Sequence, residues 1–241
     1  MKRKSSVFIK FVILATLTML VLSGCGSKSN NDTTAKAAKD EKKADQKVDN
    51  TVSKDNPIVV DKENKVVKVY ATVNGKYLVS PTRHGLNWVE GKYGDQAVLK
   101  AYANPLKFNE ALLEIGGVPA VEKGGDTSKE FETKANEKYI LGDEVKVTVS
   151  WENAGKEYDI NDVMVDSTGQ KIVYKFGGNY DTQEAKMTGC YMCFDSCPAG
   201  ITSNSTHPVG TFEGGHAEFH GNPDVLPADG TPLVLTYSIV K

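Results

Sequence analysis

The sequence predicts an α+β fold, a mainly antiparallel β domain with one clear helix, preceded by a disordered tether. Three observations support this fold class. Residues 145–152 alternate between apolar and polar side chains, which is typical of a strand with one buried face. Residues 104–117 carry the signals of one amphipathic helix. Residues 25–55 are polar and charged, with too few large apolar side chains to offset the entropy of ordering them.

The strands are identified by alternation and by the turns between them. Residues 156–160 can pair with residues 145–152 across a short turn that contains Gly155. Residues 67–73 also alternate, and Asn74-Gly75 follows them, so this stretch predicts a hairpin that continues through residues 77–79. Further strands are expected at residues 84–89, 172–176 and 233–239. Roughly seven short strands and one helix predict an α+β or mainly β domain.

The helix has a start signal, a buried face and a stop signal. Asn104 suits the capping position, and Pro105 suits the first helical position, where its missing N–H costs nothing. Gly116-Gly117 ends the helix. Between them, apolar side chains follow the i, i+3, i+4, i+7 spacing of one helix face: Phe108, Ala111, Leu112 and Ile115.

The N-terminal residues predict export and lipid anchoring. Residues 1–24 have a basic start and an apolar stretch, as in a signal peptide, and that stretch is too short for a membrane span. The sequence Leu22-Ser23-Gly24-Cys25 resembles a bacterial lipoprotein lipobox. This resemblance implies that Cys25 is acylated on sulfur and becomes the N-terminus. The bland alternative is an ordinary secretory leader. The predicted organisation is a signal peptide at 1–24, a lipid-anchored linker at 25–55 and a domain at 56–241.

The charge balance excludes one class of partner. The whole chain has a net charge of −2, and without the four basic residues of the leader 25 basic residues face 31 acidic ones, a net charge of −6. Nucleic-acid binding needs a basic surface to replace counterions, so no nucleic-acid partner is expected. The expected partner is the cell membrane, reached through the lipid anchor on its extracytoplasmic face, and the sequence names no protein partner.

Five stretches carry a family resemblance: His84 with its strand, and residues 111–117, 145–152, 189–200 and 230–235. Together they resemble the YdjY-like family of exported bacterial domains, over about residues 57–240. The resemblance implies an exported domain with these boundaries and implies no activity. Cysteine-bearing members are sometimes labelled ferredoxin-like, which makes an iron–sulfur cluster one hypothesis for the cysteines.

Three of the four cysteines lie together in the sequence Cys190-x2-Cys193-x3-Cys197-Pro198. This spacing matches the last three cysteines and the proline of the bacterial ferredoxin run C-x2-C-x2-C-x3-C-P, but Met187 occupies the first ligand position. Export as an unfolded chain also disfavours a cluster that is assembled in the cytoplasm.

Three other chemistries remain open for these cysteines. Exported thiols tend to form disulfides, which would leave one of the three cysteines over, and a Cys-x2-Cys pair can be redox-active. Three thiolates with one imidazole suit a closed zinc site. Three sulfurs with Met187 or Met192 suit Cu(I), a soft ion. Zinc or copper is therefore preferred over iron–sulfur as a cofactor.

The histidines supply the candidate imidazole. His207 follows Cys197 by ten residues and is the first choice as a ligand. His216 and His220 alternate with apolar residues as on a strand, where they would lie about 13 Å apart at about 3.3 Å per residue, too far to share one ion. His84 is distant in sequence and could complete the site from another strand.

The sequence contains no G-x-S-x-G, H-E-x-x-H, phosphate-loop or dinucleotide motif, which favours a non-catalytic protein without deciding the question. The leading hypothesis is a lipid-anchored envelope protein with a metal-binding or thiol-redox site. One alternative is a ligand-binding or assembly lipoprotein whose cysteines only form a structural disulfide. Another is an iron–sulfur component of an envelope electron-transfer pathway.

Overall fold

A computed structural model describes residues 51–241 of the chain. The predicted signal peptide, the predicted lipidation site at Cys25 and most of the predicted linker lie outside the described residues. Within the described part, none of the helices has the length and apolar character needed to span a membrane.

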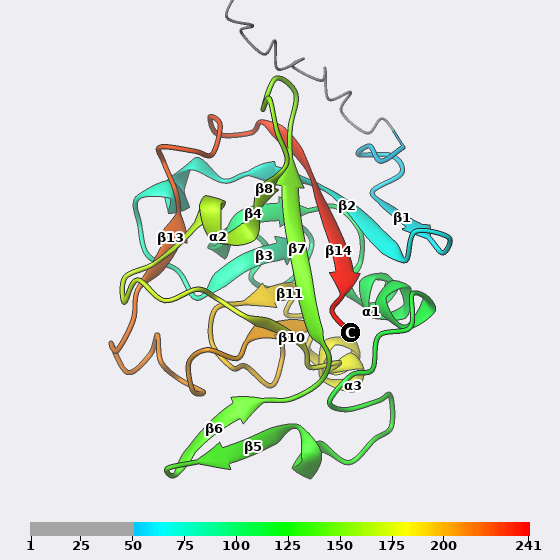
Figure 1. The fold of residues 1–241 in the computed structure, drawn as a ribbon, viewed down its shortest axis with the longest axis vertical. Coiled ribbons are helices and arrows are strands. Elements are labelled where there is room, and N and C mark those ends of the chain that lie inside the picture. The colour runs from blue at the N-terminus through cyan, green and yellow to red at the C-terminus, as the bar shows by residue number, and fades with distance from the viewer. Residues whose placement is uncertain (1–50) are drawn as a thin grey trace, which may run out of the picture. The chain divides into compact units, whose positions relative to one another are not determined.

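The described domain is built around a closed barrel of eight strands (Figure 1). The ring closes because β2 pairs with β14 on one edge and with β4 on the other. Two pairs of adjacent strands, β11–β12 and β3–β4, are parallel. The other pairs of the ring are antiparallel. In order around the barrel, the strands are β2 (Val66–Val73), β14 (Pro232–Ile239), β7 (Glu144–Ser150), β10 (Tyr174–Phe176), β12 (Thr202–Asn204), β11 (Cys190–Cys193), β3 (His84–Trp88) and β4 (Ala97–Ala101).

The predicted α+β class is therefore wrong, because the fold is mostly β and closed. The three α-helices contain only ten, four and seven residues. The closing pairs join strands that are far apart in the sequence or parallel to one another, and alternation within a strand does not reveal its partners. Closure also explains how so short a chain protects its sheet edges, since a closed ring leaves few of them unpaired.

The longest strands carry short partners where the ring leaves part of an edge free. β1 (Ile58–Asp61) pairs with the first half of β2, and β8 (Tyr158–Asp159) pairs with the second half of β7. The β7–β8 pair confirms the hairpin predicted from the alternation of residues 145–152. Inward-facing residues of β2, β7 and β14 form much of the buried core: Val67, Val69, Ala71, Val73, Val145, Val147, Val149, Leu233, Leu235 and Tyr237.

The predicted helix is confirmed as α1 (Pro105–Glu114). The Asn104 side chain accepts a hydrogen bond from Leu106 N at 2.8 Å, as its capping role requires. Gly116 adopts φ +89°, the left-handed conformation in which glycine ends helices without strain. The buried face of α1 contacts the barrel through Phe108, whose ring lies 4.6 Å from that of Tyr191.

The hairpin predicted at Asn74-Gly75 is wrong. After β2 the chain enters a short 3-10 helix, η1 (Gly75–Leu78), and does not return as a strand. The Asn74 side chain donates to the carbonyls of Asp95 and Ala97, and Gly75 N donates to Asp229 at 2.8 Å. These long-range hydrogen bonds fix Asn74 and Gly75 in a conformation other than a hairpin turn. Tertiary contacts often override a local turn signal in this way.

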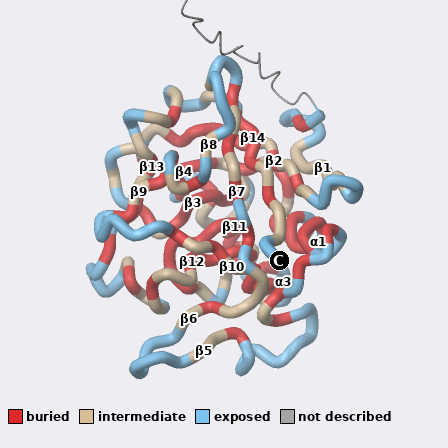
Figure 2. Tube along the Cα trace, in the orientation of Figure 1, coloured by how far each residue is buried: buried red, intermediate tan, exposed pale blue. Residues whose placement is uncertain are grey.

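The remaining elements lie outside the ring. β5 and β6 form a separate hairpin that projects from the barrel (Figure 1). β9 pairs with β13 as a second small sheet. The buried residues concentrate in the ring strands and α1, while the connecting loops are exposed (Figure 2). The bounds are η2 (Gly94–Gln96), η3 (Thr127–Lys129), β5 (Phe131–Lys134), β6 (Glu137–Ile140), α2 (Ile160–Val163), β9 (Met164–Asp166), α3 (Tyr180–Lys186) and β13 (Phe219–Gly221).

Candidate functional site

Two cysteines share one face of β11 because the strand is irregular. Residues three apart on a regular strand face opposite sides of the sheet. Here the pairing register between β11 and β3 shifts twice between Cys190 and Cys193. Tyr191 and Met192, which lie between the two cysteines, both belong to the buried core. This irregularity, a β-bulge, leaves the ligand atoms of Cys190 and Cys193 within 4.8 Å of each other.

His84 joins the two cysteines from the neighbouring strand. It is paired with Cys193 in the β3–β11 register. Its Nδ1 atom lies 3.6 Å from Cys190 Sγ, although the two residues are 106 positions apart in the sequence. The ligand atoms of His84, Cys190 and Cys193 all lie within 4.8 Å of one another, and all three residues are buried. The His84 ring also stacks on Tyr93, with a centroid separation of 5.7 Å.

Residues 194–201 form an unusually short connection between the parallel strands β11 and β12, and we call it the cysteine loop. Parallel neighbours usually need a crossover of about a dozen residues or more. Buried polar side chains compensate for the tight path. Ser196 Oγ donates to the carbonyls of Asn204 and His207, both at 2.7 Å, and Asn179 Nδ2 donates to Gly200 O at 2.9 Å. The loop brings Cys197 next to Cys193 and to the pocket that Cys190 and His84 also line.

A buried ion pair anchors the start of the cysteine loop. Arg83 Nη2 lies 2.7 Å from the carboxylate of Asp195, whose side chain has no exposed surface. The second oxygen of Asp195 accepts a hydrogen bond from Phe212 N at 2.8 Å, and Arg83 also pairs with Glu213. The backbone carbonyl of Arg83 accepts a weak hydrogen bond from the Cys193 thiol at 3.6 Å. Arg83 therefore contributes a positive charge beside the thiols and connects two loops.

The three cysteines in the described residues are free thiols. Cys193 hydrogen-bonds with Cys190 and with Cys197, so its sulfur is central to the group. Cys190 and Cys193 are buried, whereas Cys197 is partly exposed. A pocket of about 240 Å³ opens beside them, which we call the thiol pocket. Its lining comprises Arg83, His84, Tyr93, Gln96, Thr188, Cys190, Cys197 and Ala199.

The surroundings favour the uncharged forms of His84, Cys193 and Cys197. The hydrogen bond with Cys190 and then burial raise the pKa of the Cys193 thiol well above its usual value. The hydrogen bond with Cys193 and burial likewise raise the pKa of Cys197. Burial, followed by the charge of Arg83, lowers the pKa of His84 to about 4. A metal ion would bind the neutral imidazole directly and would displace protons only from the thiols.

Arg83 keeps its charge in this setting. Burial acts to lower its pKa, but the negative charge of Asp195 outweighs burial, and the pKa rises above its ordinary value. A permanent cation next to the sulfurs favours their thiolate forms once an ion is present. The donor set is therefore chemically suited to a soft or borderline metal ion.

The separation of two of the donors, His84 and Cys190, fits ligands of one tetrahedral ion. With Zn–S of about 2.3 Å and Zn–N of about 2.0–2.1 Å, a tetrahedral site places sulfur and nitrogen about 3.6 Å apart and two sulfurs about 3.8 Å apart. The observed separation of His84 Nδ1 and Cys190 Sγ is 3.6 Å. Three sulfurs and one imidazole also match a known class of four-coordinate zinc site.

The structure places the other predicted histidines away from the thiols. His207 is buried, but its Nε2 atom lies 2.6 Å from Asp166 Oδ2 and 3.5 Å from Thr168 Oγ1. His216 is exposed in a bend before β13. His220 lies on β13, and its Nδ1 atom lies 2.7 Å from Gly221 O. Among the described histidines, the one that joins the cysteines is therefore His84.

The two methionines considered as thioether ligands have other positions. Met187 is the C-cap of α3, in the left-handed conformation, and its N–H donates to Gln183 O. Met192 is in the barrel core, where Tyr237 Oη donates to its sulfur at 3.0 Å. Sequence reasoning also missed Arg83 and Asp195. The one available signal was the position of Asp195 between two clustered cysteines, because a charge there needs a partner.

The chain is similar to known proteins over most of its length. Residues 58–238 match the model of the YdjY domain. The chain is 36% identical over 229 residues to a protein of Escherichia coli (strain K12) named Uncharacterized protein YdjY, covering 95% of this chain and 93% of that protein. No solved structure matches the chain. The family match spans the barrel, the cysteine loop and His84, so the chain belongs to the YdjY domain family.

Proposed function

We propose that this protein is an extracytoplasmic lipoprotein that binds one zinc ion through Cys190, Cys193, Cys197 and His84. The observation that carries this proposal is the convergence of three buried donors, His84, Cys190 and Cys193, within 4.8 Å of one another. Two of these donors share a face only because of the β11 bulge. The third comes from a strand that is distant in the sequence.

The arrangement favours an ion over a structural disulfide as the reason for the cluster. A disulfide needs two cysteines, and it does not need an imidazole in contact with one of the sulfurs. Here the thiols are free, and His84 approaches Cys190 at the separation expected for ligands of one ion. An imidazole in the place of a thioether also favours zinc over Cu(I), because a softer set of sulfur ligands is what selects Cu(I).

Anchoring at the membrane is supported by the N-terminal sequence. The stretch Leu22-Ser23-Gly24-Cys25 resembles a lipobox, and the polar residues 26–55 would separate the acyl chains from the domain. A Cys25→Ala variant should leave the membrane fraction, while the unchanged protein stays there after washing with salt. Equal partitioning of the two proteins would contradict the anchor and would leave the metal site unaffected.

The metal proposal is tested by elemental analysis of the full chain, purified in detergent without reductant or chelator. We expect about one zinc per chain, with the thiols of Cys190, Cys193 and Cys197 protected from an alkylating probe until the zinc is removed. The His84→Gln variant should lose most of the zinc. The His216→Gln variant is the matched control, since His216 is exposed and away from the thiols, and it should keep the full amount.

The alternatives predict different results in the same measurement. One titratable thiol and no metal would indicate a disulfide with a spare cysteine. Iron with visible absorbance would indicate a cluster. Copper with the same protection pattern would keep the site and change the ion. Zinc bound equally well by both histidine variants would remove His84 from the proposed ligand set.

A further inference from the structure

We propose that the bound ion is exchangeable, that Cys197 is the ligand that leaves, and that the thiol pocket is where an acceptor with a thiolate or imidazole donor takes over the ion. This inference rests on the zinc site proposed above. The protein would then pass the ion to, or receive it from, a second protein with soft donor groups.

The four donors differ in how firmly the fold holds them. His84, Cys190 and Cys193 belong to two paired strands of the barrel wall, and their residues are 7%, 1% and 0% exposed. Cys197 belongs to the cysteine loop and is partly exposed. Three rigid donors can hold an ion while the fourth is replaced, whereas the loss of a strand donor would require the sheet to open.

The site is open on the side of Cys197. Structural zinc sites are closed by four protein ligands, whereas sites that exchange or react keep an accessible position. The thiol pocket has a volume of about 240 Å³ and is lined by Cys190, Cys197 and His84, so an incoming donor can approach three of the four ligands. Gln96 is the exposed residue at this pocket. The accessible volume has room for a side-chain thiol or imidazole.

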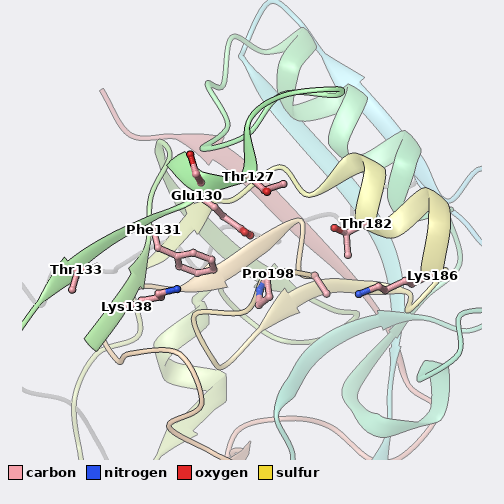
Figure 3. A pocket seen from close by; sticks show the side chains of 10 residues that line it. Thr127, Glu130, Phe131, Thr133, Lys138, Thr182, Lys186 and Pro198 are labelled. Carbon is pink, nitrogen blue, oxygen red and sulfur yellow. The ribbon is translucent and has the colours of Figure 1, made fainter. Parts of the chain in front are cut away.

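Space also exists on the other side of the loop. A second pocket of about 390 Å³, which we call the hairpin pocket, is lined by residues of the β5–β6 hairpin, α3 and the cysteine loop. Figure 3 shows Pro198 between Lys138 and Lys186, which approach from opposite sides. Ala199 lines both pockets, so residues 197–199 form a thin wall between them.

The backbone of this wall is nevertheless held. Ser203 Oγ donates to Cys197 O at 3.2 Å, and the Gln183 side chain donates to Ala199 O. Departure of Cys197 is therefore a rotation of its side chain, and the loop itself need not unfold. Side-chain rotation is fast compared with loop opening, so exchange should not wait for a slow conformational step.

The exchange balances in atoms and charge. The bond between zinc and the Cys197 sulfur breaks, and a bond between zinc and the acceptor's sulfur or nitrogen forms. An acceptor thiol releases its proton on binding, and the freed Cys197 thiolate takes one up. No oxidant or reductant is needed.

The test measures zinc transfer from the loaded full chain to the chromogenic chelator 4-(2-pyridylazo)resorcinol over a range of chelator concentrations. If the chelator enters the site before Cys197 leaves, the observed rate rises in proportion to its concentration. A rate that does not depend on chelator concentration would mean that zinc leaves by itself, and this result would overturn the proposal. Failure of the chain to bind zinc at all would instead overturn the proposed function.

Two matched variants identify the route. Gln96→Trp places a large ring at the mouth of the thiol pocket, and it should slow transfer at least tenfold without weakening zinc binding. Thr133→Trp adds the same ring at the hairpin pocket, on an exposed strand position, and should transfer zinc at the unchanged rate. Equal rates for both variants and the unchanged chain, or slowing only by Thr133→Trp, would exclude the thiol pocket as the route.

Discussion

The ion pair of Arg83 and Asp195 at the start of the cysteine loop should contribute several kcal/mol to the free energy of unfolding. The Asp195 side chain has no exposed surface, and its partners are Arg83 at 2.7 Å and Phe212 N at 2.8 Å. Removal of one partner of a buried pair leaves an uncompensated charge and costs about 3–5 kcal/mol. Because the Arg83 side chain remains 29% exposed, water screens the pair, and we expect Arg83→Met to cost about 2–3 kcal/mol.

Replacement of Asp195, the acidic partner, should lower the free energy of unfolding less than Arg83→Met does. Asp195→Asn removes the charge but keeps an oxygen for Phe212 N, and Arg83 keeps Glu213 as a partner. We expect a loss of about 1 kcal/mol, close to the net value of one hydrogen bond. The double variant should be no less stable than Arg83→Met alone, so the two changes should couple by about 1–2 kcal/mol.

The assay is urea unfolding at pH 7 with a chelator present, so that differences in zinc affinity do not contribute. A loss of about 3 kcal/mol corresponds to a Tm that is lower by about 6–12 °C for a domain of this size. An Arg83→Met variant within about 0.5 kcal/mol of the unchanged chain, together with no coupling to Asp195→Asn, would refute the reasoning. Asp195 would then be neutral or stabilised by other groups.

Three further outcomes are expected. Burial raises the pKa of Glu130 to about 7, so this group should stabilise the fold fully below about pH 4.5 and progressively less as the pH rises through 7. Glu130→Gln should abolish this pH dependence of the free energy of unfolding and be about 2 kcal/mol more stable than the unchanged chain at pH 8. The same pH dependence for both proteins in urea unfolding would contradict this. Gly142 has φ +102°, and an added Cβ would lie 2.0 Å from Phe176 O, so Gly142→Ala should lower the free energy of unfolding by more than about 3 kcal/mol. Gly155 has φ +74° and open space around it, so Gly155→Ala should lower it by only about 1 kcal/mol in the same assay. Asn104→Ala should lower the free energy of unfolding by about 1 kcal/mol through loss of the α1 cap, and an Asn104→Asp variant that is equally destabilised would argue against capping.

Local signals in the sequence predicted local structure well. The cap, the apolar stripe and the terminal glycines set the limits of α1, because each acts within a few residues. The alternation in β7 and β14 identified strands that have one face in the barrel. The same kind of reasoning was wrong at Asn74, where contacts with Asp95 and Ala97 replace the expected hairpin.

The candidate site also has one part that local sequence predicted and one part that it did not. The grouping of Cys190, Cys193 and Cys197 could be predicted because they lie within eight residues. The imidazole could not be chosen from spacing. His207 is nearer in sequence, yet the fold pairs it with Asp166, while His84 reaches Cys190 across the β3–β11 ladder. Pairing between distant strands is decided by the packing of the whole sheet, and one strand's sequence does not specify its partner.

By itself, the sequence determined where the helix begins and ends, which segments form the long strands, that three cysteines lie close together in the chain, and that the chain resembles the YdjY family. Only the tertiary structure decided that the sheet closes into a barrel and that a bulge turns Cys190 and Cys193 to one face beside His84. The physical reason is the range of the interactions. Caps, turns and alternation act between near neighbours, whereas closure and the bulge depend on how distant strands bury their side chains together.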